Sequence, residues 1–553
     1  MSLNENLSES VAPSIWWGWG DPQKAGSLSP DAEKMLREEY GVDPVETFAP
    51  VPLEQVRMPE SALDTDDLRA LRGTDSDVLL DTEERASHSG GKSYPDLYRR
   101  RTGDCENAPD AVVCPRSDEA IADILAICVE RDLAVVPYGG GTSVVGGLEP
   151  LRGGKRALLS LDLRHLSSMS DLDEANRTAT FGAGIRGPAI EAALRGHKLT
   201  LGHYPQSHQQ ASLGGYVATR SAGQASTGYG RSDQLVQRVR VITPRGPIDL
   251  GSDVPASAAG PKLIDVLIGS EGTLGVISEV TMHVHAAPKT KKYAAWAFDS
   301  FASGARAIQA ATHECGKSQL PAVCRLSDAE ETRIGLVMSG GLKARAVSKY
   351  LNVRGAAKPA LGIFIWEGDD DVTNLAKKKV EKVFAAHGGI RLGGTAAKSW
   401  EHGRFSSPYL RDGLMGRGIF VETLETAASW SRLQATYLTI QSAIEEALGS
   451  PSSVQCHISH VYDAGASLYF TFLARAEEDP IAQWRRVKTA ASEAIVDAGA
   501  TITHHHAVGA DHAPYLSHEI GDLGLDVLRS IKATLDPSGV LNPGKLMRAS
   551  DDA

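Results

Sequence analysis

The stretch Pro137-Tyr-Gly-Gly-Gly-Thr-Ser143 decides the fold, because it follows a short apolar run, Ala134–Pro137, that predicts a buried strand. Consecutive glycines after a strand let successive backbone N–H groups turn toward an anion such as a diphosphate. Thr142 and Ser143 add hydroxyl donors. Taken alone, the loop fits a tight structural turn as well as a phosphate cradle, so the surrounding sequence has to decide between them.

Two further glycine-rich segments follow the first one. Gly182-Ala-Gly-Ile-Arg-Gly187 has the spacing of a Rossmann fingerprint, but Gly202–His208, about 20 positions onward, holds no carboxylate for a ribose. The third segment is Gly269-Ser-Glu-Gly-Thr-Leu-Gly-Val-Ile277, and small residues also recur in Pro205–Gly215 and Thr219–Gly223. The missing carboxylate excludes an ordinary Rossmann site. The density of small residues predicts a large ligand, because it lets the backbone approach such a ligand along its length.

Composition limits the classes of protein to consider. The chain has 553 residues, 42% of them hydrophobic and 23% charged, which is typical of a globular protein with more than one domain. Its net charge of −12 argues against nucleic acid as a partner. The polar start Met1–Asn6, the ending Ser550–Ala553 and six scattered cysteines without a C-x-x-C pair predict a reduced cytoplasmic protein without signal peptide, membrane span or peroxisomal address.

Hydrophobic periodicity predicts alternating helices and strands from Ala108 onward. Ser117 is expected to cap a helix that ends near Asp132. Predicted strands are 157–163, 178–182, 235–243, 275–284, 361–366, 420–424 and 467–473, and predicted helices are 303–314, 374–387, 432–448 and 521–535. We therefore divide the chain into a helical lead (1–105), a first domain (106–288), a second domain (289–515) and a C-terminal segment (516–553).

The order of the small-residue segments resembles the FAD-binding domain of the p-cresol methylhydroxylase and vanillyl-alcohol oxidase class. The resemblance implies an α+β fold, in which a two-subdomain FAD-binding domain is followed by an α/β cap and a C-terminal segment that returns to the flavin. Some members attach FAD to a histidine in the first loop, where Thr142 stands here, so we predict non-covalent FAD. The implied FAD-binding residues are Pro137, Tyr138, Gly139, Gly140, Gly141, Thr142, Ser143, Pro205, Gln206, Ser207, His208, Gln209, Gln210, Ala211, Thr219, Arg220, Ser221, Ala222, Glu271, Gly272, Thr273, Leu274, Gly275, Val276 and Ile277.

Segments of the second domain, taken with one segment near the N-terminus, narrow the resemblance to the alkyldihydroxyacetonephosphate synthase family. They are Trp16–Gly20, Pro321–Asp328, Tyr409–Asp412, Cys456–Gly465 with Tyr469, and Thr503–Gly509. The family resemblance implies ether lipid synthesis without net redox change, in which a flavin N5 adduct exchanges the acyl chain of acyl-dihydroxyacetone phosphate for a fatty alcohol. It also implies lipid substrates, a homodimer and peripheral contact with a membrane.

Arg411 and Tyr469 are the residues that the resemblance places on the substrate. A guanidinium binds phosphate through two charge-assisted bonds, although Arg411 could equally be a surface residue paired with Asp412. Tyr469 would move a proton, although aromatic residues in a strand such as 467–473 are usually core. A phenol with a pKa near 10 needs local help to act as a base at neutral pH.

The tract His504-His505-His506 could supply that help or be the base itself. In an extended chain adjacent side chains alternate faces, so we expect no single metal ion to bind all three. Arg325 is expected near the flavin or the substrate, with an ion pair to Asp328 as the structural alternative. Ala507 stands where the family has glycine, which matters if the backbone there needs a positive φ.

Two other hypotheses remain from the sequence. FAD-linked 2-hydroxy-acid dehydrogenases of the D-lactate or D-2-hydroxyglutarate type share the two-domain layout and the ending Asn542–Lys545. Their metal-binding pattern H-x-G-D-G-N-x-H with a later E-H-G-x-G is incomplete here, where His460–Tyr469 and His505–Gly509 stand. A non-enzymatic flavin-binding role is disfavoured by the candidate catalytic residues beside the FAD motifs.

Overall fold

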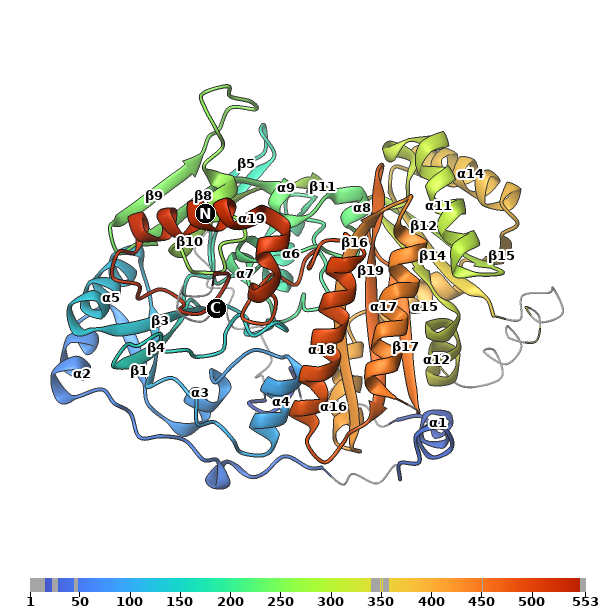
Figure 1. Ribbon diagram of the computed structural model, residues 1–553. Coiled ribbons are helices and arrows are strands. Elements are labelled where there is room, and N and C mark those ends of the chain that lie inside the picture. Colours follow the sequence, from blue (N-terminus) through green and yellow to red (C-terminus); the bar gives the residue numbers. More distant parts are fainter. Residues whose placement is uncertain are drawn as a thin grey trace.

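The computed structural model describes residues 15–21, 28–43, 48–339, 349, 351, 358–449 and 451–547. Our expectations for Met1–Asn6 and Ser550–Ala553 lie outside these residues. Figure 1 shows two halves side by side, with the blue-to-green predicted FAD-binding region on one side and the yellow-to-orange predicted cap on the other. This arrangement confirms the predicted α+β fold class.

Two sheets build the predicted FAD-binding region. One has the order β1-β2-β4-β3, in which β2, β4 and β3 are parallel, and the other is antiparallel with the order β5-β6-β10-β8-β9. Their bounds are β1 Ser76–Leu79, β2 Ala111–Pro115, β3 Leu133–Tyr138, β4 Ala157–Asp162, β5 Met169–Asp173, β6 Thr178–Gly182, β8 Val236–Thr243, β9 Gly246–Gly251 and β10 Val276–His283, with a separate pair of β7 Leu199–Thr200 and β11 His285–Ala286. The strands predicted at 157–163, 178–182, 235–243 and 275–284 are confirmed to within a residue or so.

Helices of this half cover the sheets. The helix predicted after Ser117 is α5, Asp118–Arg131, whose first turn is capped by the Ser117 side chain on the N–H of Ala120 and which ends at Asp132 with φ 56°. Its apolar face, including Ile121 and Ile124, is buried against the core of the two sheets. The other helices are α2 Thr65–Arg72, α3 Thr82–Ser87, α4 Tyr94–Arg101, α6 Gly187–Arg195, α7 Leu213–Ala218, α8 Ser226–Tyr229, α9 Ser232–Leu235 and α10 Ile264–Leu267.

The predicted cap is built on one antiparallel sheet with the order β15-β12-β14-β13-β17-β19-β16, to which β18 adds beside β19. The strands are β12 Thr290–Phe298, β13 Val323–Ser327, β14 Ala360–Gly368, β15 Ile390–Gly393, β16 Ile419–Ser429, β17 Ser452–Ile458, β18 Val461–Tyr462 and β19 Gly465–Arg475. The helices are α11 Phe301–Cys315, α12 Ala329–Ser339, α14 Asp370–Ala386, α15 Thr395–Gly403, α16 Ser407–Met415, α17 Leu433–Leu448 and α18 Pro480–Asp497. All predicted elements of this region are present, most of them longer than predicted.

The sheet register aligns three polar side chains on the cap. Tyr469 of β19 is directly opposite Glu425 of β16 on one side and His457 of β17 on the other. Residues directly opposite one another in antiparallel strands share a face of the sheet. The register therefore brings these three residues together, although Glu425 lies more than thirty positions before the other two in the sequence.

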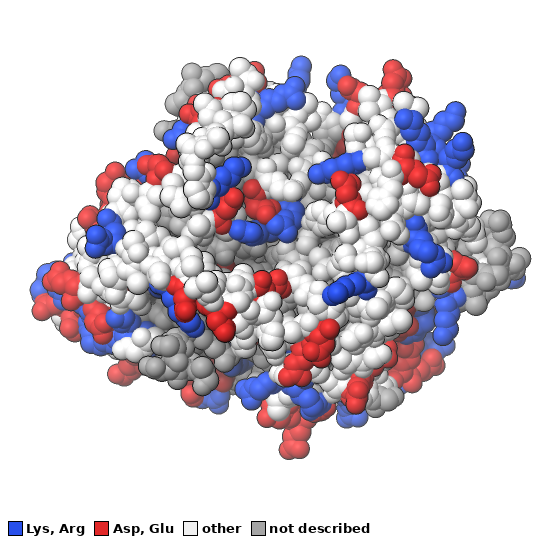
Figure 2. All heavy atoms as spheres, turned by 45° about the horizontal axis from the view of Figure 1, so that its top comes forward, with Lys and Arg blue, Asp and Glu red and all other residues white. Residues whose placement is uncertain are grey.

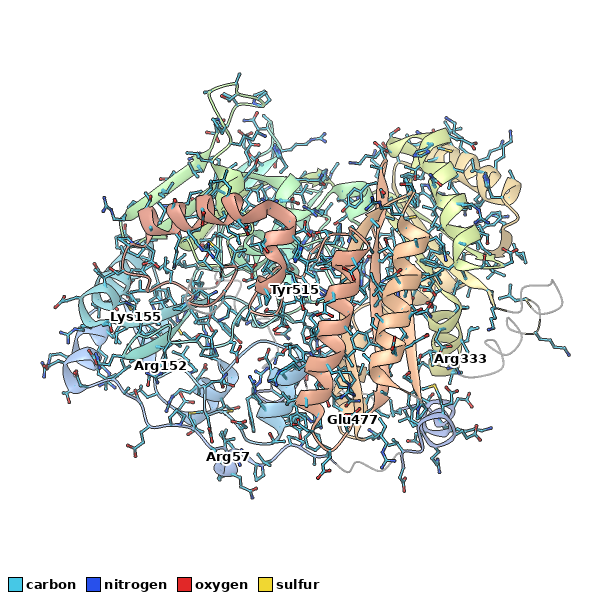
Figure 3. All side chains as sticks on the ribbon, viewed as in Figure 1. Arg57, Arg152, Lys155, Arg333, Glu477 and Tyr515 are labelled. Carbon is cyan, nitrogen blue, oxygen red and sulfur yellow. The ribbon has the colours of Figure 1, made fainter. Side chains whose placement is uncertain are left out.

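The N-terminal lead is divided between the two halves. Helix α1, Pro30–Tyr40, buries Met35 and Leu36 in the core of the cap, and Arg333 of α12 pairs with Glu39 at 2.7 Å (Figure 3). Leu63 and Leu71, in contrast, belong to the core of the FAD-binding region. The lead thus connects both halves instead of forming a body of its own.

The C-terminal segment returns to the first glycine loop. Helix α19, Leu516–Leu535, begins before its predicted start and is interrupted at Gly521, where φ is 71°. After it, the N–H of Asn542 donates to Val135 of β3 at 2.7 Å, and the N–H of Val135 donates to Val540 at 2.8 Å. This confirms the predicted return of the segment, because β3 leads directly into the loop at Gly139.

The surface carries acidic and basic side chains of both signs mixed over the face shown in Figure 2. Within the part of the chain that the structure describes, no helix combines the length and apolarity that crossing a bilayer requires.

Candidate active site

A cavity of about 460 Å³ lies between the two halves, a volume within the range of small-molecule sites. One wall comes from the glycine-rich loops and the other from strands β16, β17 and β19 with helix α16. The cavity thus collects residues from both predicted domains.

The first glycine loop forms part of the cavity wall and packs closely against the segment 210–212. A Cβ on Gly139 would overlap Oγ of Ser212, and a Cβ on Gly140 would overlap the carbonyl oxygen of Gln210. Gly141 has φ 68°, a conformation that glycine adopts without strain. Glycine is therefore required here by packing and conformation, while the backbone stays open toward the cavity.

Most of the predicted FAD-binding residues line this cavity. They are Pro137, Tyr138, Gly139, Gly140, Gly141, Thr142, Ser143, Pro205, Gln206, Ser207, Ala211, Thr219, Ser221, Ala222, Glu271, Gly272, Gly275 and Ile277. Small side chains dominate this wall, so that a long planar ligand with a diphosphate can lie along it. This is the property that FAD requires of its site.

The remaining predicted FAD-binding residues are not among those that line the cavity, and FAD binding by them stays a prediction. They are His208, Gln209, Gln210, Arg220, Thr273, Leu274 and Val276. Arg220 points outward and donates to the carbonyls of Ile268 and Asp265. The His208 ring stacks on Phe405.

The histidine tract is bent around a buried carboxylate. Glu425 accepts the N–H groups of His504, His505 and His506 at 2.8–3.0 Å. His505 and His506 line the cavity, whereas His504 lies behind them and bonds through Nε2 to the hydroxyl of Tyr462 at 2.6 Å. The tract is therefore not extended, contrary to our expectation that its side chains alternate faces.

The bend brings potential metal-ligand atoms together. Nδ1 of His504 lies 2.9 Å from Nδ1 of His505, and Nδ1 of His505 lies 3.3 Å from a carboxylate oxygen of Glu425. The ligand atoms of the three residues all lie within 4.8 Å of one another. Our expectation of a site without a metal ion stays a prediction. The reason we gave for it, the alternation of side chains in an extended chain, does not apply to this bent tract.

Tyr469 lies in the cavity wall between histidines. Its ring stacks on His457 with centroids 4.9 Å apart, and the His506 ring meets it edge-on at 5.4 Å. Burial raises the pKa of Tyr469 to about 12 and lowers the pKa of His506 to about 3. At neutral pH the phenol is therefore protonated and His506 is neutral, so that Tyr469 is a donor and His506 an acceptor.

Arg325 lines the cavity, but its partner is not the predicted one. It pairs with Glu331 at 2.8 Å, and Glu331 also lies 2.9 Å from Nδ1 of His457. Asp328 instead accepts from the N–H of Cys456 and the hydroxyl of Tyr437. The structural alternative, an ion pair of Arg325 with Asp328, is not formed, because Glu331 in the first turn of α12 reaches the guanidinium. The role of Arg325 near the flavin or the substrate stays a prediction.

Arg411 of α16 lines the cavity, and a backbone carbonyl fixes one end of its guanidinium. Its Nη1 donates to the carbonyl of Lys92 at 2.7 Å, while Nε is buried and has no hydrogen-bond partner among the described residues. Asp412, the alternative partner for Arg411, accepts the N–H of Trp19 at 2.6 Å. The guanidinium is thus available to an anionic ligand.

One part of the cavity wall is apolar. The side chains that line this part share an aliphatic or thioether character and come from α1, α12, α16, β16 and β19; they are Met35, Ile334, Met338, Leu410, Leu414, Val421 and Leu473. An extended hydrocarbon chain gains free energy by burial against such a surface.

Several residues of the site had no role predicted from the sequence. His457 and His460 line the cavity and stand in the segment Cys456–Gly465, so the motif contained the signal. Glu425 was missed, because only its contact with residues almost eighty positions later gives it a role. A glutamate directly after the predicted strand 420–424 was the signal that could have indicated it.

Comparisons with known proteins agree with this geometry. Residues 109–250 match the family model described as FAD binding domain, and residues 287–546 match FAD linked oxidases, C-terminal domain. The alkyldihydroxyacetonephosphate synthase of Trypanosoma brucei brucei is 31% identical over 497 residues, which cover 87% of this chain and 80% of that protein. The synthase of Dictyostelium discoideum is 32% identical over 476 residues, 84% of this chain and 77% of that protein.

A solved structure of an alkyldihydroxyacetonephosphate synthase superposes with a TM-score of 0.82 at 27% identity, covering 97% of this chain and 99% of that chain. Fold, cavity and matches together define an FAD-binding enzyme with the two-domain architecture of the FAD-linked oxidases. Within this class, the chain belongs to the alkyldihydroxyacetonephosphate synthase family.

Proposed function

We propose that this enzyme exchanges the acyl chain of acyl-dihydroxyacetone phosphate for a fatty alcohol, with no net change of redox state. One observation carries the proposal: a single cavity joins the FAD loops, an available guanidinium at Arg411, a protonated phenol at Tyr469 and an apolar wall. A phosphorylated substrate with a long chain needs all of these features. A small hydroxy acid needs no apolar wall of this kind.

Each feature has a part in the reaction. Arg411 holds the phosphate through charge-assisted bonds, which places the ketone carbons near Tyr469. Tyr469 holds a proton at its phenolic oxygen, and the neutral ring of His506 can accept one from a carbon next to the ketone. The apolar wall holds the departing or incoming chain and excludes water. Bound FAD supplies an electrophilic centre beside these groups.

The test uses purified FAD-loaded protein with acyl-dihydroxyacetone phosphate and labelled hexadecanol. We expect labelled alkyl product without oxygen consumption, measured by chromatography of the lipids and with an oxygen electrode. Reduction of the flavin by D-lactate or D-2-hydroxyglutarate, together with absence of ether product, would favour the 2-hydroxy-acid dehydrogenase hypothesis instead.

We also propose that FAD is bound without a covalent link, because Thr142, and no histidine, stands in the first loop. Acid precipitation should leave the flavin in the supernatant, and a yellow pellet would contradict this. The predicted homodimer, cytoplasmic location and peripheral membrane contact stay predictions, which light scattering, fractionation and vesicle flotation would test.

A further inference from the structure

Glu425 is a buried carboxylate whose hydrogen bonds all come from one short segment. The residue is 1% exposed and lies in the largely buried strand β16. Besides the N–H groups of His504, His505 and His506, it accepts the hydroxyl of Thr503 at 2.7 Å. A buried carboxylate is costly without such donors, so the carboxylate and the bend of the segment stabilise each other.

The bend decides where the imidazoles lie. In an extended chain the side chains of His505 and His506 would point to opposite faces. Here both line the cavity, with ring centroids 6.2 and 5.4 Å from that of Tyr469. Tyr469 itself is the direct cross-strand neighbour of Glu425. The carboxylate of Glu425 thus lies between Tyr469 and the histidines 505 and 506, but Glu425 itself does not line the cavity.

The carboxylate also orients the ring of His505. Nδ1 of His505 lies 3.3 Å from the Glu425 carboxylate, so that Nε2 is the nitrogen available to a substrate. Burial opposes ionisation of Glu425, but His505 and the neighbouring histidines hold the pKa of Glu425 well below its usual range, and the donated N–H groups act in the same direction. The carboxylate is therefore an anion at the pH of catalysis.

We propose that Glu425 is a positioning residue of the active site, which gathers the backbone N–H groups of residues 504–506 and so places the imidazoles of His505 and His506 against Tyr469. Its effect on turnover rests on the proposed function. Its effect on the conformation of the tract does not.

A matched pair of glutamates on the same strand allows a sharp test. Glu422 of β16 is also 1% exposed, but it accepts from the N–H of Tyr94 and from Nε1 of Trp484 and does not line the cavity. Glu425→Gln should lower kcat by about 100-fold or more, with KM within about threefold and normal FAD content. Glu425→Asp keeps the charge and should recover part of the loss, whereas Glu422→Gln should lower stability and leave kcat within about twofold.

Hydrogen exchange of the backbone amides in 503–507 provides a readout that needs no substrate. We expect exchange at least about tenfold faster in Glu425→Gln and unchanged in Glu422→Gln, because only the first variant loses carboxylate acceptors for these amides. If Glu425→Gln fails to fold, Glu425→Asp should show the same acceleration to a smaller degree.

Each result decides the proposal. Wild-type kcat or wild-type amide exchange in Glu425→Gln would overturn it. One zinc or manganese ion per wild-type chain, absent from Glu425→Gln and needed for turnover, would overturn it in favour of a metal-ligand role. Absence of ether synthesis by the wild type would contradict the proposed function alone, and amide exchange would still decide whether Glu425 holds the tract.

Discussion

Two buried glutamates from opposite halves of the molecule bind the same short segment. Glu425 of the cap accepts the N–H groups of residues 504–506, and Glu271 of the third glycine segment accepts those of Val508 and Gly509 at 2.8 and 2.7 Å. Ala507 lies between the two sets. The segment 503–509 therefore joins both halves at the wall of the cavity.

The two carboxylates differ in charge state. Imidazoles, three backbone N–H groups and one hydroxyl surround Glu425, and its pKa lies well below the usual range. Burial raises the pKa of Glu271 to about 7, and its two backbone N–H bonds oppose this only in part. Burial alone therefore does not set the charge of a carboxylate. Burial raises the pKa of both, but the imidazoles beside Glu425, His505 first, lower its pKa by more, whereas the two N–H donors and Lys545 do not offset burial at Glu271. Under the proposed function, proton transfer belongs to the cap side and loop organisation to the FAD side.

Replacing Tyr469 tests the first assignment and has the largest expected effect. Tyr469→Phe removes only the phenolic oxygen, so kcat should fall by about 100- to 10,000-fold while FAD content stays normal. Stopped-flow turnover assays and flavin absorbance would measure both. Tyr437→Phe is the control, because that hydroxyl donates to Asp328 in the cap core, and it should lower stability without lowering kcat. Near-normal turnover by Tyr469→Phe would remove the proton-transfer role from the cap.

Glu271 should make stability depend on pH in the opposite sense to Glu425. Because the folded pKa of Glu271 is raised from 4.5 to about 7, the folded state binds the proton more tightly, and its contribution to the free energy of unfolding falls as pH rises from about 4.5 to 7. The full change is about 3 kcal/mol, at about 1.4 kcal/mol per pKa unit. Glu425, with its lowered pKa, contributes stability above its unfolded pKa that is lost on acidification.

Urea unfolding of wild type and Glu271→Gln at pH 5.0 and 7.5 checks this prediction. The variant should lose less stability than the wild type between the two pH values. Equal losses in the two proteins would show that Glu271 is ionised throughout, and the contrast with Glu425 would then disappear.

Arg411 tests whether the cap side also binds the substrate. Arg411→Ala removes charge-assisted bonds of about 1.5–3 kcal/mol each, so KM for the phosphorylated substrate should rise about tenfold or more, with normal FAD content. Arg411→Lys keeps the charge without the planar fork and should rescue only in part. Arg417, which donates to the carbonyl of Gly413 near the end of α16, gives the control Arg417→Ala. An unchanged KM in Arg411→Ala would remove the phosphate site from the proposal.

The FAD side and the cap side also differ in how much the sequence could predict. The glycine loops were predictable, because the need for glycine at positions such as Gly140 is local and the motifs occur in a fixed order. For Arg325 the sequence offered Asp328 as an alternative partner and did not indicate Glu331, since choosing between two nearby acids needs the path of α12. The bend of the histidine tract depends on Glu425, a residue from another strand, and no local pattern contains it.

The last helix shows how far a local pattern reaches. The helix predicted at 521–535 is present as the longer part of α19, which follows the non-helical Gly521 with φ 71°. The short helical stretch before Gly521 was not predicted, and it packs Leu516 into a small apolar cluster with Val508. Its position depends on this tertiary contact, which no local pattern contains.

Ala507 is the link between the two glutamates and has the smallest expected effect. Its φ is 77°, and an alanine in this region is strained by its Cβ, whereas glycine is not. Ala507→Gly should therefore raise the free energy of unfolding by about 0.5–1 kcal/mol, with kcat within about twofold because the N–H groups on both sides remain bound. Ala510→Gly is the matched control in the same segment, where φ is negative, and it should lower stability by a similar amount because glycine adds only chain entropy there. Urea midpoints of both variants decide the matter. If Ala507→Gly destabilises as Ala510→Gly does, the backbone between the two carboxylates is not strained. If it instead lowers kcat strongly, the segment needs the rigidity of alanine to keep His506 in place while Glu271 holds Val508.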